Sequence, residues 1–364
     1  MPERGVPACE LAVTKDGETV YRKSVGFSDS AKTKPACPDD IYWIFSATKV
    51  ITCTAATRLV ESGVIALDDP VSKYIPEFEH LIIKNKDGSL VPAQNTLTVE
   101  HLFTMTGGLT YNLGTANILL AKKFDTSTLH IVKAMAKDPL VFEPGTHYQY
   151  SLCHDVLAAV VEVASGIRFS EYLQKNIFDP LGMKDIGFRP TEEQKARFSA
   201  MYKTESGTRR ANEIDCINRF RITEDYDSGG AGLFSTVDEY IKLITALACG
   251  GTAKNGYKVL SPESVRMMGE NRLCDAALNN FVNTRLYGYG WGLCGRAHMD
   301  PVMSRSKSPV GEFGWDGACG ALALVDPTNK LAIYFGTHIM GYQYLYHSVH
   351  CEIRNMVYDA LADN

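Results

Sequence analysis

Ser46 and Lys49 stand three residues apart at the start of the apolar stretch 41–63 (IYWIFSATKVITCTAATRLVESG). Residues i and i+3 share a face of a helix, so the Lys49 ammonium can reach the Ser46 hydroxyl. A serine at a helix N-terminus also lies among backbone N–H groups without helical partners, where negative charge is favoured. The apolar flanks should desolvate Lys49 and lower its pKa, which would make it a proton acceptor. The pair predicts a serine nucleophile with a proton relay.

The spacing Ser-x-x-Lys occurs a second time, from Ser304 to Lys307. That copy lies in the polar, proline-interrupted segment MSRSKSPVGE, with no apolar helix behind it. We expect this second copy to be an exposed loop. Only the copy at Ser46 has a context suited to catalysis.

A nucleophile of this kind needs another proton-handling group and a second oxyanion donor. Tyr150 follows the Pro144-Gly145 turn and precedes an apolar helix, so its phenol should be held at a rigid corner. Tyr148 is a rival for this role, and either tyrosine could instead be a packed residue with a satisfied hydroxyl. The segment EFGWDGACGALALVD reads as a strand entered through Gly314 and Gly317, where small residues let a substrate approach the backbone.

The elements that position these residues gather at the two ends of the chain. Residues 9–26 predict an antiparallel hairpin that turns at Asp16-Gly17. Residues 321–338 predict a second hairpin, and residues 343–361 have the spacing of a closing amphipathic helix. We therefore expect one antiparallel sheet built from both chain ends and flanked by helices.

The middle of the chain is mainly helical in pattern. Residues 153–166 and 236–251 have apolar residues at helical spacing and end on glycine. The predicted fold is α/β (α+β), with a sheet subdomain from residues 1–70 and 235–364 and a mainly helical inserted subdomain, residues 71–234. Together they would form one catalytic domain.

Composition excludes several classes of protein. The 364 residues are 45% hydrophobic and carry a net charge of −5 without a basic run, which argues against nucleic acid or an anionic membrane as a partner. The N-terminal residues have no apolar signal core, and no stretch is long enough to span a bilayer. The simplest expectation is a soluble cytoplasmic protein, although removal of a leader would leave the same pattern.

Ten scattered cysteines form no C-x-x-C pair and no zinc spacing, so we expect reduced thiols that pack as small apolar side chains. His347 and His350 could share a helix face and bind a metal, but no third ligand is indicated, and packed or solvated histidines are expected instead.

The elements around Ser46, Tyr150 and Trp315, in this order, resemble the serine β-lactamase and penicillin-binding-protein superfamily. They are most similar to its class C branch and the related esterases and D-amino-acid peptidases (peptidase family S12-like). Further landmarks of that family are similar to stretches along the whole chain: residues 59–78, 97–109, 142–152, 177–188 and 228–240.

The resemblance implies the β-lactamase/transpeptidase-like fold and roles for individual residues. Ser46 would be the acylated nucleophile, Lys49 its relay partner, and Tyr150 the tyrosine that activates the serine or protonates the leaving group. The stretch from Trp315 to Gly317 takes the place of the family's Lys-Thr-Gly strand motif. Ala318 would then supply an oxyanion-hole N–H beside that of Ser46. The reaction would use no metal and no organic cofactor.

Three departures from the lactamase pattern bear on the substrate. Leu152 stands where lactamases carry an asparagine, so it offers no amide to a substrate side chain. Trp315 replaces a cation, and Asp316 adds a carboxylate to the same edge. A carboxylate substrate would meet a like charge, so we expect efficient β-lactamase and carboxypeptidase activity to be absent. Leu152, Trp315, Asp316 and Gly317 are the predicted substrate-binding residues.

The leading prediction is a carboxylesterase that acts on esters of small or medium acyl groups. Asp316 could favour aminoacyl substrates by binding an amine, or it could point into solvent or pair with a basic side chain. The competing functions are a D-aminopeptidase or amide hydrolase, a weak β-lactamase, an acyltransferase that uses the same acyl-enzyme, and a catalytically silent ligand sensor. The expected partner is a small-molecule ester or amide, and the sequence does not decide the oligomeric state.

Overall fold

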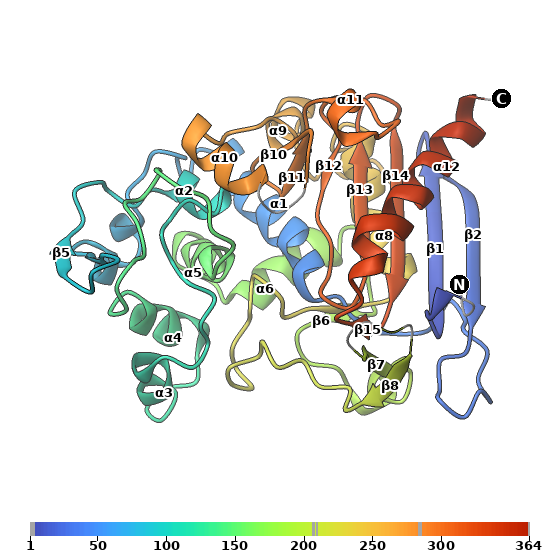
Figure 1. Cartoon of the computed structure of the whole chain (residues 1–364), viewed down its shortest axis with the longest axis horizontal. Helices are drawn as coiled ribbons and strands as arrows, with labels where there is room; N and C mark the ends of the chain where they lie inside the picture. The colour runs from blue at the N-terminus through green and yellow to red at the C-terminus, as the bar shows by residue number, and fades with distance from the viewer. Residues whose placement is uncertain (1–3, 206–207, 209, 283–285, 363–364) are drawn as a thin grey trace.

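The computed structural model describes residues 4–205, 208, 210–282 and 286–362. Its largest element is a seven-stranded antiparallel sheet in the order β10-β11-β12-β13-β14-β1-β2 (Figure 1). The strands are β1 (Ala8–Lys15), β2 (Glu18–Gly26), β10 (Tyr289–Trp291), β11 (Arg296–His298), β12 (Phe313–Gly314), β13 (Leu322–Asp326) and β14 (Leu331–Thr337). Because β1 pairs with β14, the two ends of the chain share one sheet, as the sequence predicts.

The two predicted hairpins define the register of this sheet. Asp16 and Gly17 have φ angles of 51° and 85°, which are the left-handed values that a two-residue turn between twisted strands requires. β13 and β14 form the second hairpin, with Leu322 opposite Phe335. Pairing of β1 with β14 then places Cys9 opposite Thr337 and joins the two hairpins in one open sheet.

Alternate residues of the central strands bury opposite faces of the sheet. Ile333 and Phe335 pack in the cluster with α12 (His350–Ala362), which follows a π-helical turn at Leu345–Val349. On the opposite face, α8 (Val237–Ala248) stacks Tyr240 on Tyr334, with ring centroids 4.1 Å apart. The predicted helices at 343–361 and 236–251 therefore cover the two faces of one sheet.

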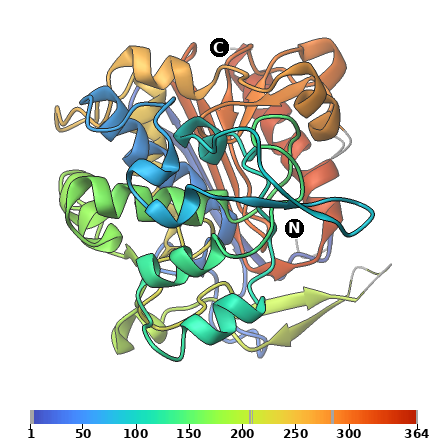
Figure 2. The same ribbon diagram turned by 90° about the vertical axis from the view of Figure 1, so that its left-hand side faces the viewer.

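The remaining elements lie beside the sheet (Figures 1 and 2). The α-helices are α1 (Thr48–Glu61), α2 (Val99–Phe103), α3 (Ala116–Ala121), α4 (Thr128–Met135), α5 (Cys153–Ser165), α6 (Phe169–Leu173), α7 (Glu192–Lys195), α9 (Pro262–Met268), α10 (Asp275–Val282) and α11 (Pro301–Ser304). Single helical turns occupy Phe45–Ala47, Val71–Lys73, Pro76–Phe78 and Gln174–Phe178. Short strands pair as β3 (Tyr42–Trp43), β9 (Phe234–Ser235) and β6 (Ile186–Gly187), as β15 (Ile339–Met340), β7 (Met201–Thr204) and β8 (Ala211–Ile214), and as β4 (Ile82–Lys84) with β5 (Leu90–Pro92).

The predicted helix 153–166 corresponds to α5, which ends at Gly166 with a φ of 72°. The segment 71–234 contains helices and also several of the short strands, and its boundaries as a subdomain stay a prediction. Figure 2 shows this segment in front of the sheet. No helix within the described residues is long and apolar enough to cross a membrane.

Five of the ten cysteines are buried as the sequence predicts, four are partly buried, and Cys274 is exposed. All ten cysteines are free thiols, and Cys53, Cys153 and Cys319, which flank the three motifs, are buried. His350 is buried, and its Nε2 lies 3.0 Å from the carbonyl oxygen of Gly320. Across the described part of the chain, no group of His, Cys, Asp or Glu side chains is arranged to hold a metal ion.

Candidate active site

Ser46 lies at a tight junction between a strand and a helix. β3 pairs with β9, and the Ile44 N–H donates to the Leu233 carbonyl, which fixes the chain just before the serine. Phe45 then has a φ of 45°, a left-handed value that is strained for a bulky residue. Ser46 follows within a single helical turn that runs directly into α1, and only 9% of its surface is exposed. The strained turn presents the hydroxyl at the mouth of the helix.

Lys49 is fully buried beneath Ser46. Its Nζ donates to the Gly230 carbonyl at 2.7 Å and lies 3.5 Å from the Ser46 hydroxyl oxygen. The ammonium also lies 4.5 Å from the centroid of the Tyr150 ring and 5.5 Å from that of Tyr111. The structure therefore brings the two residues of the first motif together with the tyrosine of the second.

A buried carboxylate, that of Asp155, lies near Lys49, and both side chains approach Gly230. Its Oδ1 accepts hydrogen bonds from the Tyr226 and Ser228 hydroxyls at 2.9 and 2.7 Å, while its Oδ2 has no hydrogen-bond partner within the described residues. A Cβ on Gly230 would lie 2.5 Å from this Oδ2 and 3.4 Å from the Lys49 Nζ. The glycine thus lets the 228–233 loop pass between the acid and the ammonium. Burial is the main influence on Asp155 and raises its pKa.

The pKa of Lys49 differs from the sequence prediction. Burial acts to lower it, as expected, but Tyr111, Tyr150 and the Asp155 carboxylate outweigh burial, and the pKa of Lys49 is raised above its ordinary value. The prediction of a lowered pKa is therefore wrong, because the apolar flanks of the helix conceal polar partners from other segments. The raised pKa favours the protonated form of Lys49.

Tyr150 contacts aromatic residues from two other segments, Trp315 and Tyr111. The Trp315 indole Nε1 donates to the Tyr150 hydroxyl oxygen at 2.9 Å, and the two ring centroids lie 5.6 Å apart. Tyr111 stacks on the other side at 5.5 Å, with the ring planes 8° from parallel. The rival Tyr148 is buried against Phe281 and Trp291 instead. Of the two candidate tyrosines, Tyr150 is therefore the one that contacts Lys49.

The turn after β12 brings Ala318 close to the start of the helix. A Cβ on Gly317 would lie 2.4 Å from the carbonyl oxygen of Ile44, so only glycine permits this approach. The Gly317 N–H donates to Ala321, which shapes the turn, while within the described residues no backbone carbonyl accepts from the Ala318 N–H. The two N–H groups predicted for the oxyanion hole, those of Ser46 and Ala318, thus belong to adjoining segments.

Two predicted substrate-binding side chains have other partners. Asp316 forms an ion pair with Arg296, with Nη1 and Oδ1 2.7 Å apart, and its Oδ2 lies 3.4 Å from the His350 Nδ1. Although burial opposes it, the Arg296 guanidinium holds the pKa of Asp316 well below its usual range. Asp316 therefore pairs with a basic side chain, and its carboxylate is not free to bind a substrate amine. Leu152 is 3% exposed and packs in the main core, so its side chain does not line an open site.

The Asp316–Arg296 pair gives a stability prediction. Arg296 is 1% exposed and also neighbours the buried Glu312, so Arg296→Met would remove the guanidinium that lies between these two carboxylates. We expect the free energy of unfolding at neutral pH to fall by about 3–5 kcal/mol. Because the folded-state pKa of Asp316 is lowered, the stabilisation is present above the ordinary carboxyl pKa and is lost as pH falls toward the lowered value. The difference in the free energy of unfolding between wild type and Arg296→Met should therefore become smaller at acidic pH.

Urea unfolding from neutral to acidic pH measures this difference. Lys307→Met is the matched control, because it removes an ion pair with Asp359 that is about half exposed, and should change stability by less than about 1 kcal/mol. A similarly small change in Arg296→Met would contradict the prediction.

The second Ser-x-x-Lys copy has a different environment. Ser304 ends the short helix α11, and its hydroxyl lies 2.8 Å from the His298 Nε2. Lys307 is exposed and pairs with Asp359. The prediction of an exposed loop therefore holds for Lys307, but it is wrong for Ser304, which ends a helix and contacts a histidine, and for Ser306, which is buried.

Residues 1–343 match the protein-family model described as Beta-lactamase. The chain belongs to the beta-lactamase family, and its fold is the expected β-lactamase/transpeptidase type.

Two curated relatives and one solved structure show the range of the similarity. Protein Rv1367c from Mycobacterium tuberculosis (strain ATCC 25618 / H37Rv) is 30% identical over 325 residues, covering 85% of this chain and 80% of that protein. Esterase EstB from Burkholderia gladioli is 30% identical over 366 residues, covering 92% and 87%. The solved structure of EstCE1, described as a hydrolase with promiscuous acyltransferase activity, has a TM-score of 0.81 at 22% identity and covers 98% of this chain and 95% of that one.

Sequence reasoning missed Asp155 and Tyr111. Asp155 is a charged residue within the apolar helix that follows Tyr150. A charged residue in an otherwise apolar segment needs a polar partner, and this signal could have revealed it. Tyr111 lies just beyond the stretch 97–109, and nothing in its neighbours indicates that it stacks on Tyr150.

Proposed function

We propose that the protein is a serine hydrolase that cleaves esters of small or medium acyl groups through an acyl-enzyme on Ser46. The observation that carries the proposal is the buried Lys49 ammonium that lies beside both the Ser46 hydroxyl and the Tyr150 ring. The similarity to Esterase EstB supports ester substrates.

Acylation begins when the Ser46 oxygen attacks the ester carbonyl, and the Tyr150 hydroxyl gives its proton to the ester's leaving oxygen as the Ser46 proton passes to the Tyr150 oxygen. Negative charge on that oxygen is stabilised by the nearby Lys49 ammonium and by the hydrogen bond from Trp315. The carbonyl oxygen becomes an oxyanion, which the N–H groups of Ser46 and Ala318 stabilise. When the tetrahedral intermediate collapses, the carbon–oxygen bond of the ester breaks and the alcohol leaves with the proton from Tyr150.

Deacylation repeats these steps with water as the nucleophile. Water attacks the acyl carbon and passes a proton to the Tyr150 oxygen, while the Tyr150 hydroxyl gives its own proton to the Ser46 oxygen and the bond between that oxygen and the acyl carbon breaks. The products are the free carboxylic acid and the original enzyme.

The charges at the substrate edge favour uncharged esters. Trp315 occupies the place of the family's cation, and its indole N–H is committed to Tyr150. Arg296 is buried and committed to Asp316, so it offers no charge to a substrate carboxylate. β-Lactams and peptides with a C-terminal carboxylate would lack a counter-charge at this edge.

A panel of p-nitrophenyl esters of increasing acyl length, assayed beside a chromogenic cephalosporin, tests the proposal. We expect hydrolysis of the shorter esters at least about a hundredfold above the cephalosporin, which is the discrimination that a missing charged contact can produce. Preference for the cephalosporin would contradict it. Labelling of Ser46 by a fluorophosphonate separates the enzyme from a silent ligand sensor, which would not be labelled.

Acyl transfer to an alcohol is the second candidate function. It requires only that the acceptor replace water at the same acyl-enzyme, and the similarity to EstCE1 in fold motivates the test. The ratio of new ester to free acid, measured with added short alcohols, distinguishes the two activities.

Asp155→Asn tests the proposed state of Lys49. The Asp155 charge helps to raise the pKa of Lys49, so its removal should lower that pKa and deprotonate the ammonium at less alkaline pH. If catalysis needs the ammonium, kcat/KM should decrease as pH rises from neutral to alkaline, and the decrease should be about tenfold larger for the variant than for the wild type. Superimposable pH–rate profiles would contradict this role.

A further inference from the structure

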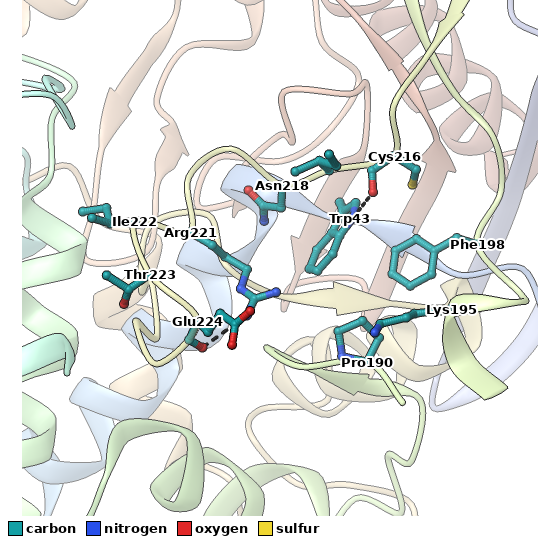
Figure 3. A pocket seen from close by; sticks show the side chains of 11 residues that line it. Trp43, Pro190, Lys195, Phe198, Cys216, Asn218, Arg221, Ile222, Thr223 and Glu224 are labelled. Atoms are coloured by element: carbon teal, nitrogen blue, oxygen red, sulfur yellow. Dashed lines mark hydrogen bonds between the residues drawn. The ribbon is translucent and has the colours of Figure 1, made fainter. Parts of the chain in front are cut away.

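A pocket of about 500 Å³ lies behind the loop that follows β8. Trp43 and Phe198 give it an aromatic wall, with ring centroids 5.1 Å apart, and the Trp43 indole donates to the Cys216 carbonyl at 3.2 Å (Figure 3). Pro190 and Ile222 add further apolar surface. The pocket is therefore shaped for a flat apolar group.

Arg221 supplies a cation that has no ion pair among the described residues. Figure 3 shows its guanidinium beside Glu224, which also lines the pocket, with Trp43 and Pro190 across from it. Its Nη2 donates to the Glu224 carbonyl at 3.2 Å, while its Nε is buried and has no hydrogen-bond partner within the described residues. The neighbouring Asp227 is already held by Arg168 and Arg189. Burial, reinforced by Arg189, lowers the pKa of Arg221, which is the effect of a cation without full compensation.

The pocket and the catalytic site lie on opposite sides of one loop. Phe220, the residue before Arg221, packs edge-to-face on Phe45 and Tyr111, with ring centroids 5.8 and 5.7 Å apart. Phe45 precedes Ser46, and Tyr111 stacks on Tyr150. Neither Ser46 nor Tyr150 lines the pocket. It is a separate cavity that shares a wall with the site of chemistry.

We propose that this pocket binds a small aromatic carboxylate, with its ring against Trp43 and Phe198 and its carboxylate on the Arg221 guanidinium. The guanidinium provides paired donors that suit a carboxylate, and the aromatic wall provides the stacking surface. The proposal is independent of the ester substrate and of catalysis at Ser46.

Calorimetric titration of 2-naphthoate into the Ser46→Ala protein tests the proposal without turnover. We expect one site, and we expect Arg221→Gln to weaken binding at least about tenfold because a charged hydrogen bond is lost. Arg219→Gln is the matched control, since Arg219 is exposed and does not line the pocket, and it should bind as the parent does. The neutral 2-naphthylmethanol should bind more weakly than 2-naphthoate.

Two further measurements keep the test decisive. Wild-type enzyme blocked at Ser46 by a fluorophosphonate should bind 2-naphthoate unchanged, whereas loss of binding would place the probe in the catalytic site and overturn the proposal. If Arg221→Gln does not fold, Ile217→Glu adds a like charge at the pocket lining from a residue that is 57% exposed, and it should also weaken binding. Absence of binding, or equal binding by the Arg221 and Arg219 variants, would also overturn the proposal.

Discussion

Lys49→Met should lower kcat for a p-nitrophenyl ester by about a thousandfold, within the range for loss of a group that stabilises charge in the transition state. Methionine keeps much of the buried volume but removes the ammonium that lies 3.5 Å from the Ser46 oxygen and 4.5 Å from the Tyr150 ring centroid. Negative charge would then form on the Tyr150 oxygen without its cation. Steady-state kinetics across the ester panel measures the loss.

The control must separate lost chemistry from lost stability. Lys49→Met alone leaves the buried Asp155 carboxylate uncompensated, which is destabilising. Combining it with Asp155→Asn removes that carboxylate, so the double variant should regain thermal stability but not activity. Recovery of activity in the double variant would contradict a catalytic role for Lys49.

Tyr150→Phe should lower kcat by about a hundredfold or more, because the hydroxyl that carries the proton is removed while the ring remains. The stacking with Tyr111 and the contact with Trp315 depend on the ring and should persist. The variant should therefore unfold at nearly the wild-type temperature, and the comparison of kcat with thermal stability identifies a chemical defect.

Two matched variants accompany Tyr150→Phe. Tyr148→Phe alters the neighbouring tyrosine, which packs against Phe281 and Trp291, and should leave kcat within about threefold of wild type, because no proton-handling group is lost. Trp315→Phe removes the N–H donor to Tyr150 and should lower kcat about tenfold. A larger loss in Tyr148→Phe than in Tyr150→Phe would contradict the role given to Tyr150.

Patterns local in sequence predicted most of the framework. The Asp16-Gly17 turn and the second hairpin determine which strands pair, and the glycine that ends α5 marks its boundary. The pairing of β1 with β14 follows from the clustering of strands at both ends of the chain. Ser46, Lys49 and Tyr150 can be found because each has a helix or turn beside it in sequence.

The remaining features depend on contacts between distant segments. The raised pKa of Lys49 arises from Tyr111, Tyr150 and Asp155, none of which adjoins it in sequence. The partners of Asp316 come from β11 and α12, so its commitment to Arg296 could not be decided from the strand motif alone. The burial of Leu152 could not be predicted from its local motif either, because it depends on the packing of several helices.

The central claim is a covalent acyl-enzyme on Ser46. Intact-protein mass spectrometry of enzyme quenched during turnover of a p-nitrophenyl ester tests it most directly, with peptide mapping to locate the added acyl group. We predict one added acyl group on the peptide containing Ser46, absent in Ser46→Ala and retained in Ser304→Ala. An acyl group on another residue, or ester turnover that survives in Ser46→Ala, would contradict the account.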